Sequence, residues 1–113
     1  MAARLNYVEL PVDDVAGCKR FYAEAFGWSF TEFGPDYAAT ITGDTDVGLN
    51  GDRAQRTAHL LPVVEVDDLE ATLVAVEAAG GLVTLPIFAF PGGRRFHFTD
   101  PHGHELAAMQ AEG

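Results

Sequence analysis

The sequence has 113 residues, of which 48% are hydrophobic and 21% charged, and its formal net charge is −10. This length and composition are typical of one globular domain with one core. The acidity excludes a polyanion-binding function, so we expect no nucleic acid and no membrane as partner.

The N-terminal half begins with a run that lacks the apolar stretch of a signal peptide, so we expect a cytoplasmic protein. Residues 5–12, LNYVELPV, predict a strand, and Asp13 and Asp14 then predict the N-cap of a helix that ends at Gly27. An apolar stripe on this helix places Cys18, the only cysteine, in the core. Three further strands are predicted over 28–33, 37–42 and 47–50.

The C-terminal half repeats this order at an offset of about 54 residues, where Val-Asp-Asp recurs at 66–68. A strand is predicted over 59–66, and Asp67 with Glu70 fits a capping box at the start of the next helix. Gly80 and Gly81 end that helix, and strands follow over 82–90, 94–99 and 104–110. Each half therefore predicts the order βαβββ.

Two segments carry a family resemblance: YVELPVDDVAGCKRFYAEAFGW near the start and FTDPHGHELAAMQ near the end. Together with the doubled βαβββ order they resemble the glyoxalase/bleomycin-resistance/dioxygenase superfamily, also called vicinal oxygen chelate proteins. The resemblance spans the whole chain and implies an α+β fold, with two modules forming curved mixed sheets around a cavity, often as a homodimer. We expect a single domain over 1–113, with modules at about 4–52 and 59–110 joined by a linker at about 53–58.

The resemblance also implies four positions at which relatives hold a divalent metal, and here they fall on Tyr7, Gly48, Leu61 and Ala107. Leucine, alanine and glycine side chains have no donor atoms, and a lone neutral tyrosine is a poor ligand. The sequence therefore predicts no metal and no cofactor. The Asp-Pro-His-Gly segment predicts a β-turn with His102 and His104 in water, and a non-standard metal site using these residues or His59 is the alternative left open.

Strand alternation assigns one face of each predicted sheet to the helix and the other to the cavity. Glu9 interrupts an apolar strand on the cavity side, and with His97 it forms the candidate catalytic acid–base pair. Aromatic residues at the rim are Phe88, Phe90 and Trp28. The predicted ligand-binding residues are Tyr7, Glu9, Leu61, Val63, Arg95, His97, Glu105, Ala107 and Met109.

The preferred function is that of a metal-independent member that binds a small hydrophobic or cationic aromatic compound, which it would sequester. One alternative is a glyoxalase-like lyase or isomerase in which Glu9 and His97 act as acid and base. Another is a non-catalytic homodimeric scaffold that presents Trp28, Phe88 and Phe90 to a partner. The residues leave the ligand's identity, the existence of turnover and any exchange of modules within a dimer open.

Overall fold

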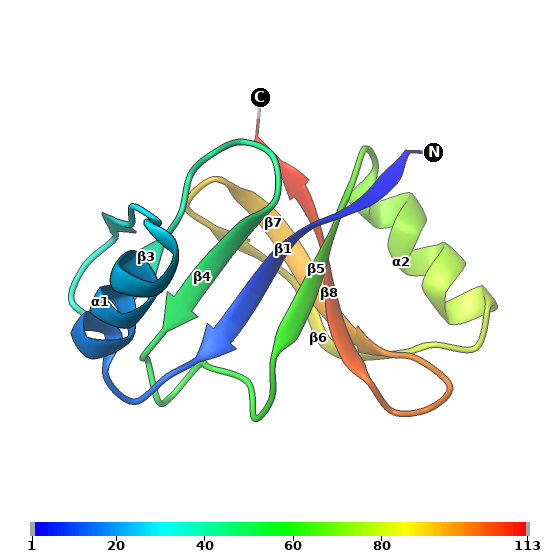
Figure 1. The fold of residues 1–113 in the computed structure, drawn as a ribbon. Helices are drawn as coiled ribbons and strands as arrows, with labels where there is room; N and C mark the ends of the chain where they lie inside the picture. Colours follow the sequence, from blue (N-terminus) through cyan, green and yellow to red (C-terminus); the bar gives the residue numbers. More distant parts are fainter. Residues whose placement is uncertain (1, 113) are drawn as a thin grey trace. The chain divides into compact units, whose positions relative to one another are not determined.

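A computed structural model of the chain describes residues 2–112. The contacts divide the chain into two compact units, an N-terminal unit, Tyr7–Leu61, and a C-terminal unit formed by Met1–Asn6 with Pro62–Gly113. The elements follow the order strand, helix and three strands, twice (Figure 1). The predicted α+β class and the doubled βαβββ order are confirmed.

The N-terminal unit contains a mixed sheet with the strand order β2-β3-β4-β1, in which β1 and β4 are parallel and the other pairs antiparallel. The strand expected over 28–33 is wrong in extent, because only two of its residues pair with β3. The elements of this unit are β1 (Ala3–Pro11), α1 (Val15–Phe26), β2 (Thr31–Glu32), β3 (Tyr37–Ala39) and β4 (Asp46–Asn50).

The C-terminal unit repeats the mixed pattern with the order β5-β8-β7-β6, in which β5 and β8 are parallel. The first residues of β1 also belong to this unit, where Arg4 and Asn6 contact Glu65 at 4.0 and 3.2 Å. The remaining elements are β5 (Leu61–Val66), α2 (Leu69–Ala78), β6 (Leu82–Phe90), β7 (Gly93–Thr99) and β8 (Glu105–Ala111).

Each helix begins at an aspartate, because a side-chain oxygen there can accept an otherwise unpaired backbone N–H of the first turn. Asp14 and Asp68 each accept such a bond, at 3.0 Å, from the residue three positions later. The capping box expected from Asp67 and Glu70 is wrong, because the cap falls one residue later, and Glu70 pairs with Arg94 at 2.5 Å instead. Neither helix within residues 2–112 is long and apolar enough to cross a membrane.

The two helices are covered to very different extents by their own sheets. In the C-terminal unit α2 packs against β6, β7 and β8 over a core that includes the fully buried Leu69 and Phe96. In the N-terminal unit α1 packs against β3 and β4 (Figure 1). None of its residues is buried. The expectation that Cys18 lies in a core is therefore wrong, because Cys18 is only half-buried.

Candidate functional site

The strand registers identify equivalent positions in the two modules. Glu9 pairs with Gly48 across β1 and β4, and Val63 pairs with Ala107 across β5 and β8. Because Glu9 and Val63 are 54 residues apart, the repeat makes Gly48 the counterpart of Ala107. The same reasoning relates Tyr7 to Leu61, Tyr37 to Arg95 and Asn50 to Met109.

A buried polar network occupies this face of the N-terminal unit. The Tyr37 hydroxyl donates to Oε1 of Glu9 at 2.9 Å, and the Tyr7 and Tyr37 hydroxyl oxygens lie 2.5 Å apart. Since the Tyr37 proton is directed to Glu9, the Tyr7 hydroxyl must donate to Tyr37. Nδ2 of Asn50 donates to the other oxygen, Oε2, at 3.3 Å. Glu9 is only 2% exposed, and both of its oxygens accept hydrogen bonds, which is what a buried carboxylate requires.

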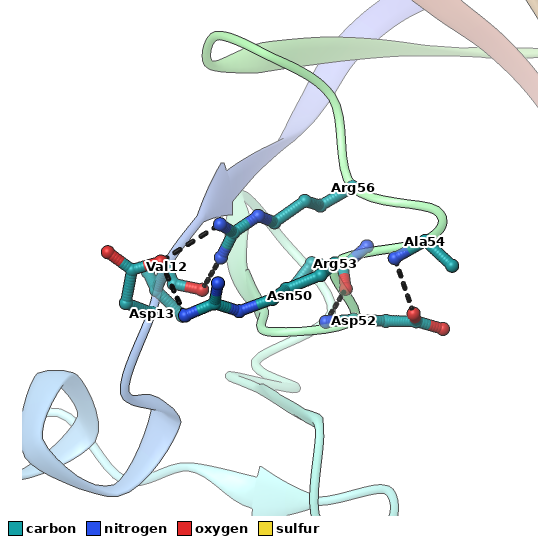
Figure 2. A network of polar contacts seen from close by, with 7 residues as sticks. All are labelled: Val12, Asp13, Asn50, Asp52, Arg53, Ala54 and Arg56. Atoms are coloured by element: carbon teal, nitrogen blue, oxygen red, sulfur yellow. Dashed lines mark hydrogen bonds and ion pairs between the residues drawn. The ribbon is translucent and has the colours of Figure 1, made fainter.

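The orientation of the Asn50 amide follows from the backbone around it. Oδ1 of Asn50 accepts the N–H of Asp52 at 2.9 Å (Figure 2). The amide must therefore turn its donor, Nδ2, toward Glu9. The segment after Asp52 is itself held to the end of β1. Arg56 donates to the carbonyl oxygen of Val12 and pairs with Asp13 at 2.9 Å (Figure 2). The segment that follows β4 thus contributes to the placement of the Glu9 carboxylate.

Tyr37 stays protonated throughout the physiological pH range. Burial removes its hydroxyl from water, and the adjacent Glu9 carboxylate opposes a second negative charge, so the pKa of Tyr37 lies far above its ordinary value. The phenol therefore acts as a hydrogen-bond donor to Glu9 and not as a base.

Gly48 makes room for the two phenols. A Cβ atom built on Gly48 would lie 2.0 Å from the Tyr7 hydroxyl oxygen and 2.3 Å from that of Tyr37, far inside any real contact distance. A glycine is therefore required while both hydroxyls hold these positions. The space next to β4 that a side chain would use at this position is filled by two neutral phenols.

The corresponding face of the C-terminal unit combines one cation with aromatic rings. Phe96 and Phe98 pack with α2, so alternation places Arg95 and His97 on the opposite face, as predicted from the sequence. The Arg95 guanidinium carbon lies 5.3 Å from the ring centre of Phe88 and 5.5 Å from that of Phe90. Both distances are within the range of a cation–π interaction.

His97 is held by a carboxylate on the neighbouring strand. It is 3% exposed, and its Nδ1 lies 3.1 Å from Oε2 of Glu105, which also lies 3.4 Å from the Thr84 hydroxyl. Because an ionised carboxylate only accepts hydrogen bonds, Nδ1 carries the proton, and the lone pair of a neutral imidazole is then on Nε2. The Phe88 ring centre lies 5.9 Å from that of His97. This arrangement fixes the ring and its tautomer.

The remaining predicted ligand-binding residues are apolar. Leu61, Val63 and Ala107 are buried, and Met109 is half-buried. These residues of β5 and β8 form an aliphatic surface. At the equivalent positions the other module has the polar residues Tyr7, Glu9 and Asn50. The enclosing cavity itself stays a prediction.

The residues present do not fit the metal site that the resemblance implies. Three of the four positions are leucine, glycine and alanine, and the fourth, Tyr7, is a neutral phenol bonded to Tyr37. Within residues 2–112 there is no group of three His, Cys, Asp or Glu side chains close enough to share an ion. His104 lies at an exposed turn, where its Nδ1 is 3.1 Å from Asp100, and His59 and His102 are also exposed.

Two residues of the network, Tyr37 and Asn50, were not predicted from the sequence. The signal that could have found them is the repeat combined with alternation, because they are the counterparts of Arg95 and Met109, which were predicted. Of the three aromatic residues expected at an exposed rim, only Trp28 is exposed. Phe88 and Phe90 are half-buried against Arg95, and their place at the rim of a cavity stays a prediction.

A model of the Glyoxalase/Bleomycin resistance protein/Dioxygenase superfamily matches residues 4–108. The chain belongs to this superfamily. A putative glyoxylase from Mycobacterium tuberculosis, CFP32, is 29% identical over 117 residues, which cover 94% of this chain and 45% of that protein. The chain thus spans less than half the length of this superfamily relative.

Two solved structures show the same superfamily fold. One is a glyoxalase/bleomycin resistance protein/dioxygenase superfamily member from Vibrio splendidus 12B01, with a TM-score of 0.71, 18% identity and coverage of 98% of this chain and 100% of that chain. The other is a Mn(II)-bound glyoxalase from Novosphingobium aromaticivorans, with a TM-score of 0.70, 24% identity and coverage of 96% and 40%.

Proposed function

We propose that this chain is a metal-independent, small-molecule-binding member of the superfamily. The observation that carries the proposal is the position of the Tyr7 and Tyr37 hydroxyls, which fill the space beside Gly48. In a metal-binding relative a carboxylate at that position would face an ion. In this chain two hydroxyl groups occupy that space, and Gly48 itself offers no side-chain donor for a metal ion.

The ligand that suits these residues is largely apolar with one polar or cationic group. Val63, Ala107 and Met109 supply aliphatic contact, Phe88 supplies an aromatic ring, and Glu9 supplies the one buried negative charge of its network. A mainly apolar surface with a few fixed polar groups is typical of small-molecule sites. The net charge of −10 favours a neutral or cationic compound over an anion.

A thermal-shift screen tests this function directly. We expect at least one hydrophobic or cationic aromatic compound to raise the melting temperature in a dose-dependent manner, equally with and without a chelator, because binding to the folded state alone stabilises it. Glu9→Gln should lower the affinity for a cationic ligand. The control Glu24→Gln, on the exposed side of α1, should leave this affinity unchanged. Stabilisation that disappears with the chelator would contradict the proposal.

A second function is favoured by the geometry of His97. We propose, as the alternative, a glyoxalase-like lyase or isomerase in which Glu9 and His97 move protons. The hydrogen bond from Nδ1 to Glu105 fixes the orientation of the ring and leaves Nε2 as the nitrogen that can accept a proton. Catalytic histidines are usually oriented by such a bond. Turnover of a 2-oxoaldehyde–thiol adduct by the wild type, lost in Glu9→Gln and in His97→Gln, would establish this function over simple binding.

We also propose that the chain forms a homodimer. Phe21, Phe26 and Phe33 are each more than half exposed, and large exposed apolar side chains of this kind often lie in interfaces. Molar mass measured by light scattering over a range of micromolar concentrations should be twice the chain mass, and the double variant Phe21→Ser, Phe26→Ser should lower it. A strict monomer at all concentrations would contradict this assembly. The cytoplasmic location stays a prediction.

A further inference from the structure

The N-terminal unit has a hollow where the C-terminal unit has a packed core. Phe96 fills the space beneath α2, and its counterpart by strand register is Ala38, which pairs with Leu49 as Phe96 pairs with Ala108. On the helices, the repeat places Lys19 where α2 has Leu73. Phe96 and Leu73 therefore have no large apolar counterpart between α1 and its sheet, although the fully buried Leu49 replaces the smaller Ala108.

A pocket of about 770 Å³ lies beside this layer, between the end of α1 and the strands β1 and β4, and all of its lining residues belong to the N-terminal unit. Val8, Leu10 and Val47 form an apolar floor on the helix-facing side of β1 and β4. Tyr22 and Trp28, at the end of α1, form an aromatic wall with parallel rings, 5.4 Å apart at 14°. This floor is on the face opposite to the one that carries Tyr7 and Glu9, because alternate residues of β1 point to opposite faces. Asp46, which pairs with Tyr7, lines the pocket from the first position of β4.

A fixed carboxylate lies at the polar end of the pocket. Oδ1 of Asp46 accepts hydrogen bonds from the Thr40 hydroxyl at 2.6 Å and from the Thr42 hydroxyl and backbone N–H at 2.9 Å, and Oδ2 accepts from Gly43 at 3.1 Å. Burial raises the pKa of Asp46, but these hydrogen bonds outweigh it and the net pKa is below the ordinary value. The side chain is therefore ionised at neutral pH, and Oδ2 has room for another donor.

We propose that this helix-side pocket of the N-terminal unit binds an aromatic ammonium compound, with its ring against Tyr22 and Trp28 and its cationic group toward Asp46. An apolar floor, an electron-rich aromatic wall and one fixed anion are the three features that such a ligand needs. The site is separate from the Glu9 face, so it does not rest on the proposed function of that face.

Trp28 is the only tryptophan and lines this pocket, so its fluorescence responds directly to a ligand bound there. The probes are phenylbutylammonium, neutral phenylbutanol and anionic phenylbutyrate, which share one ring and one chain length. We expect saturable changes in Trp28 emission with affinities in the order ammonium, alcohol, carboxylate. Equal affinities for all three, or no saturable change with any of them, would overturn the proposal.

Three variants locate the binding. Asp46→Asn should lower the affinity for phenylbutylammonium about fivefold, as expected for a partly exposed ion pair, and leave the affinity for phenylbutanol unchanged. Val47→Phe, which fills the floor, should remove binding of both, whereas Val74→Phe, the same change at an exposed position on α2, should have no effect.

Glu9→Gln separates the two faces. If Glu9→Gln binds phenylbutylammonium as tightly as the wild type does, the helix-side pocket is supported. This holds even if the thermal-shift screen finds no ligand for the Glu9 face. Loss of Trp28 quenching in Glu9→Gln but not in Asp46→Asn would place the ligand on the other face and overturn the inference. Thermal unfolding of each variant shows whether it is folded, and if Val47→Phe is not, Asp46→Asn still decides the case.

Discussion

At the scale of single residues, the buried Glu9 carboxylate accepts hydrogen bonds from a phenol and an amide. Tyr37 and Asn50 each give it one hydrogen bond, and Tyr7 supports Tyr37. A buried carboxylate without hydrogen-bond donors would be costly, so removing any one of these residues takes a hydrogen bond from the network. These three residues are therefore tied to Glu9 by energetic need and not by packing alone.

The raised pKa of Tyr37 predicts how the protein behaves at alkaline pH. A phenol whose pKa is raised by folding adds stability below the unfolded value, near 10, and this stability is lost as the pH rises above it. The chain has three tyrosines, and the absorbance of phenolate counts how many of them ionise as the pH rises. We expect the folded chain to form at least one phenolate fewer than the denatured chain at the same alkaline pH. Tyr37→Phe should flatten the alkaline loss of stability. Full titration of all three in a folded protein would contradict this.

Gly48→Ala tests the close approach of the phenols. The added methyl group overlaps both hydroxyl oxygens, so we expect a loss of about 1–3 kcal/mol in the free energy of unfolding, measured with urea. The same change in the Tyr7→Phe, Tyr37→Phe background should cost less, because both overlapping oxygens are gone and only the Cζ atom of the ring at position 7, at 2.8 Å, remains close. An equal cost in both backgrounds would show that Gly48 is needed for another reason.

Sequence alternation predicted the faces of Glu9, Arg95 and His97, because side-chain direction in a strand is a local property. It did not predict Tyr37 as the partner of Glu9. These residues are 28 positions apart in the chain, and their contact depends on the registers of β1, β3 and β4. Register between strands is set by tertiary packing, which a single sequence shows only indirectly.

At the scale of elements, the repeat predicted the order of strands and helices but not how well each helix is covered. Both helices have apolar stripes and aspartate caps, so their local signals are alike. The difference lies in the strand beneath, where Phe96 supports α2 and Ala38 does not support α1. Helix burial therefore depended on a residue outside the helix.

The helix cap gives a prediction at this scale. Asp68→Ala removes the acceptor of the Ala71 N–H, and we expect it to cost about 1 kcal/mol in the free energy of unfolding. The neighbouring change Asp67→Ala, outside the cap, should cost less than about 0.5 kcal/mol. Urea denaturation of both variants provides the comparison, and a larger effect for Asp67→Ala would restore the capping box that the sequence suggested.

At the scale of the whole molecule, the two modules share the order βαβββ but differ at equivalent positions, which are polar in the first module and apolar in the second. The first module has Tyr7, Glu9 and Asn50 where the second has Leu61, Val63 and Met109. The residues at the four metal positions, Tyr7 and Gly48 in the first module and Leu61 and Ala107 in the second, have no charged side chain that could bind an ion. The account therefore rests on the claim that this superfamily member works without a bound metal ion.

The metal content of the purified chain tests that claim most directly. The chain is expressed with added manganese, iron, nickel and zinc, purified without chelator and analysed by plasma mass spectrometry. The account predicts far less than one ion per chain, because neutral phenols and aliphatic groups hold divalent metals poorly. One ion per chain that survives desalting and is lost in Tyr7→Phe would contradict it.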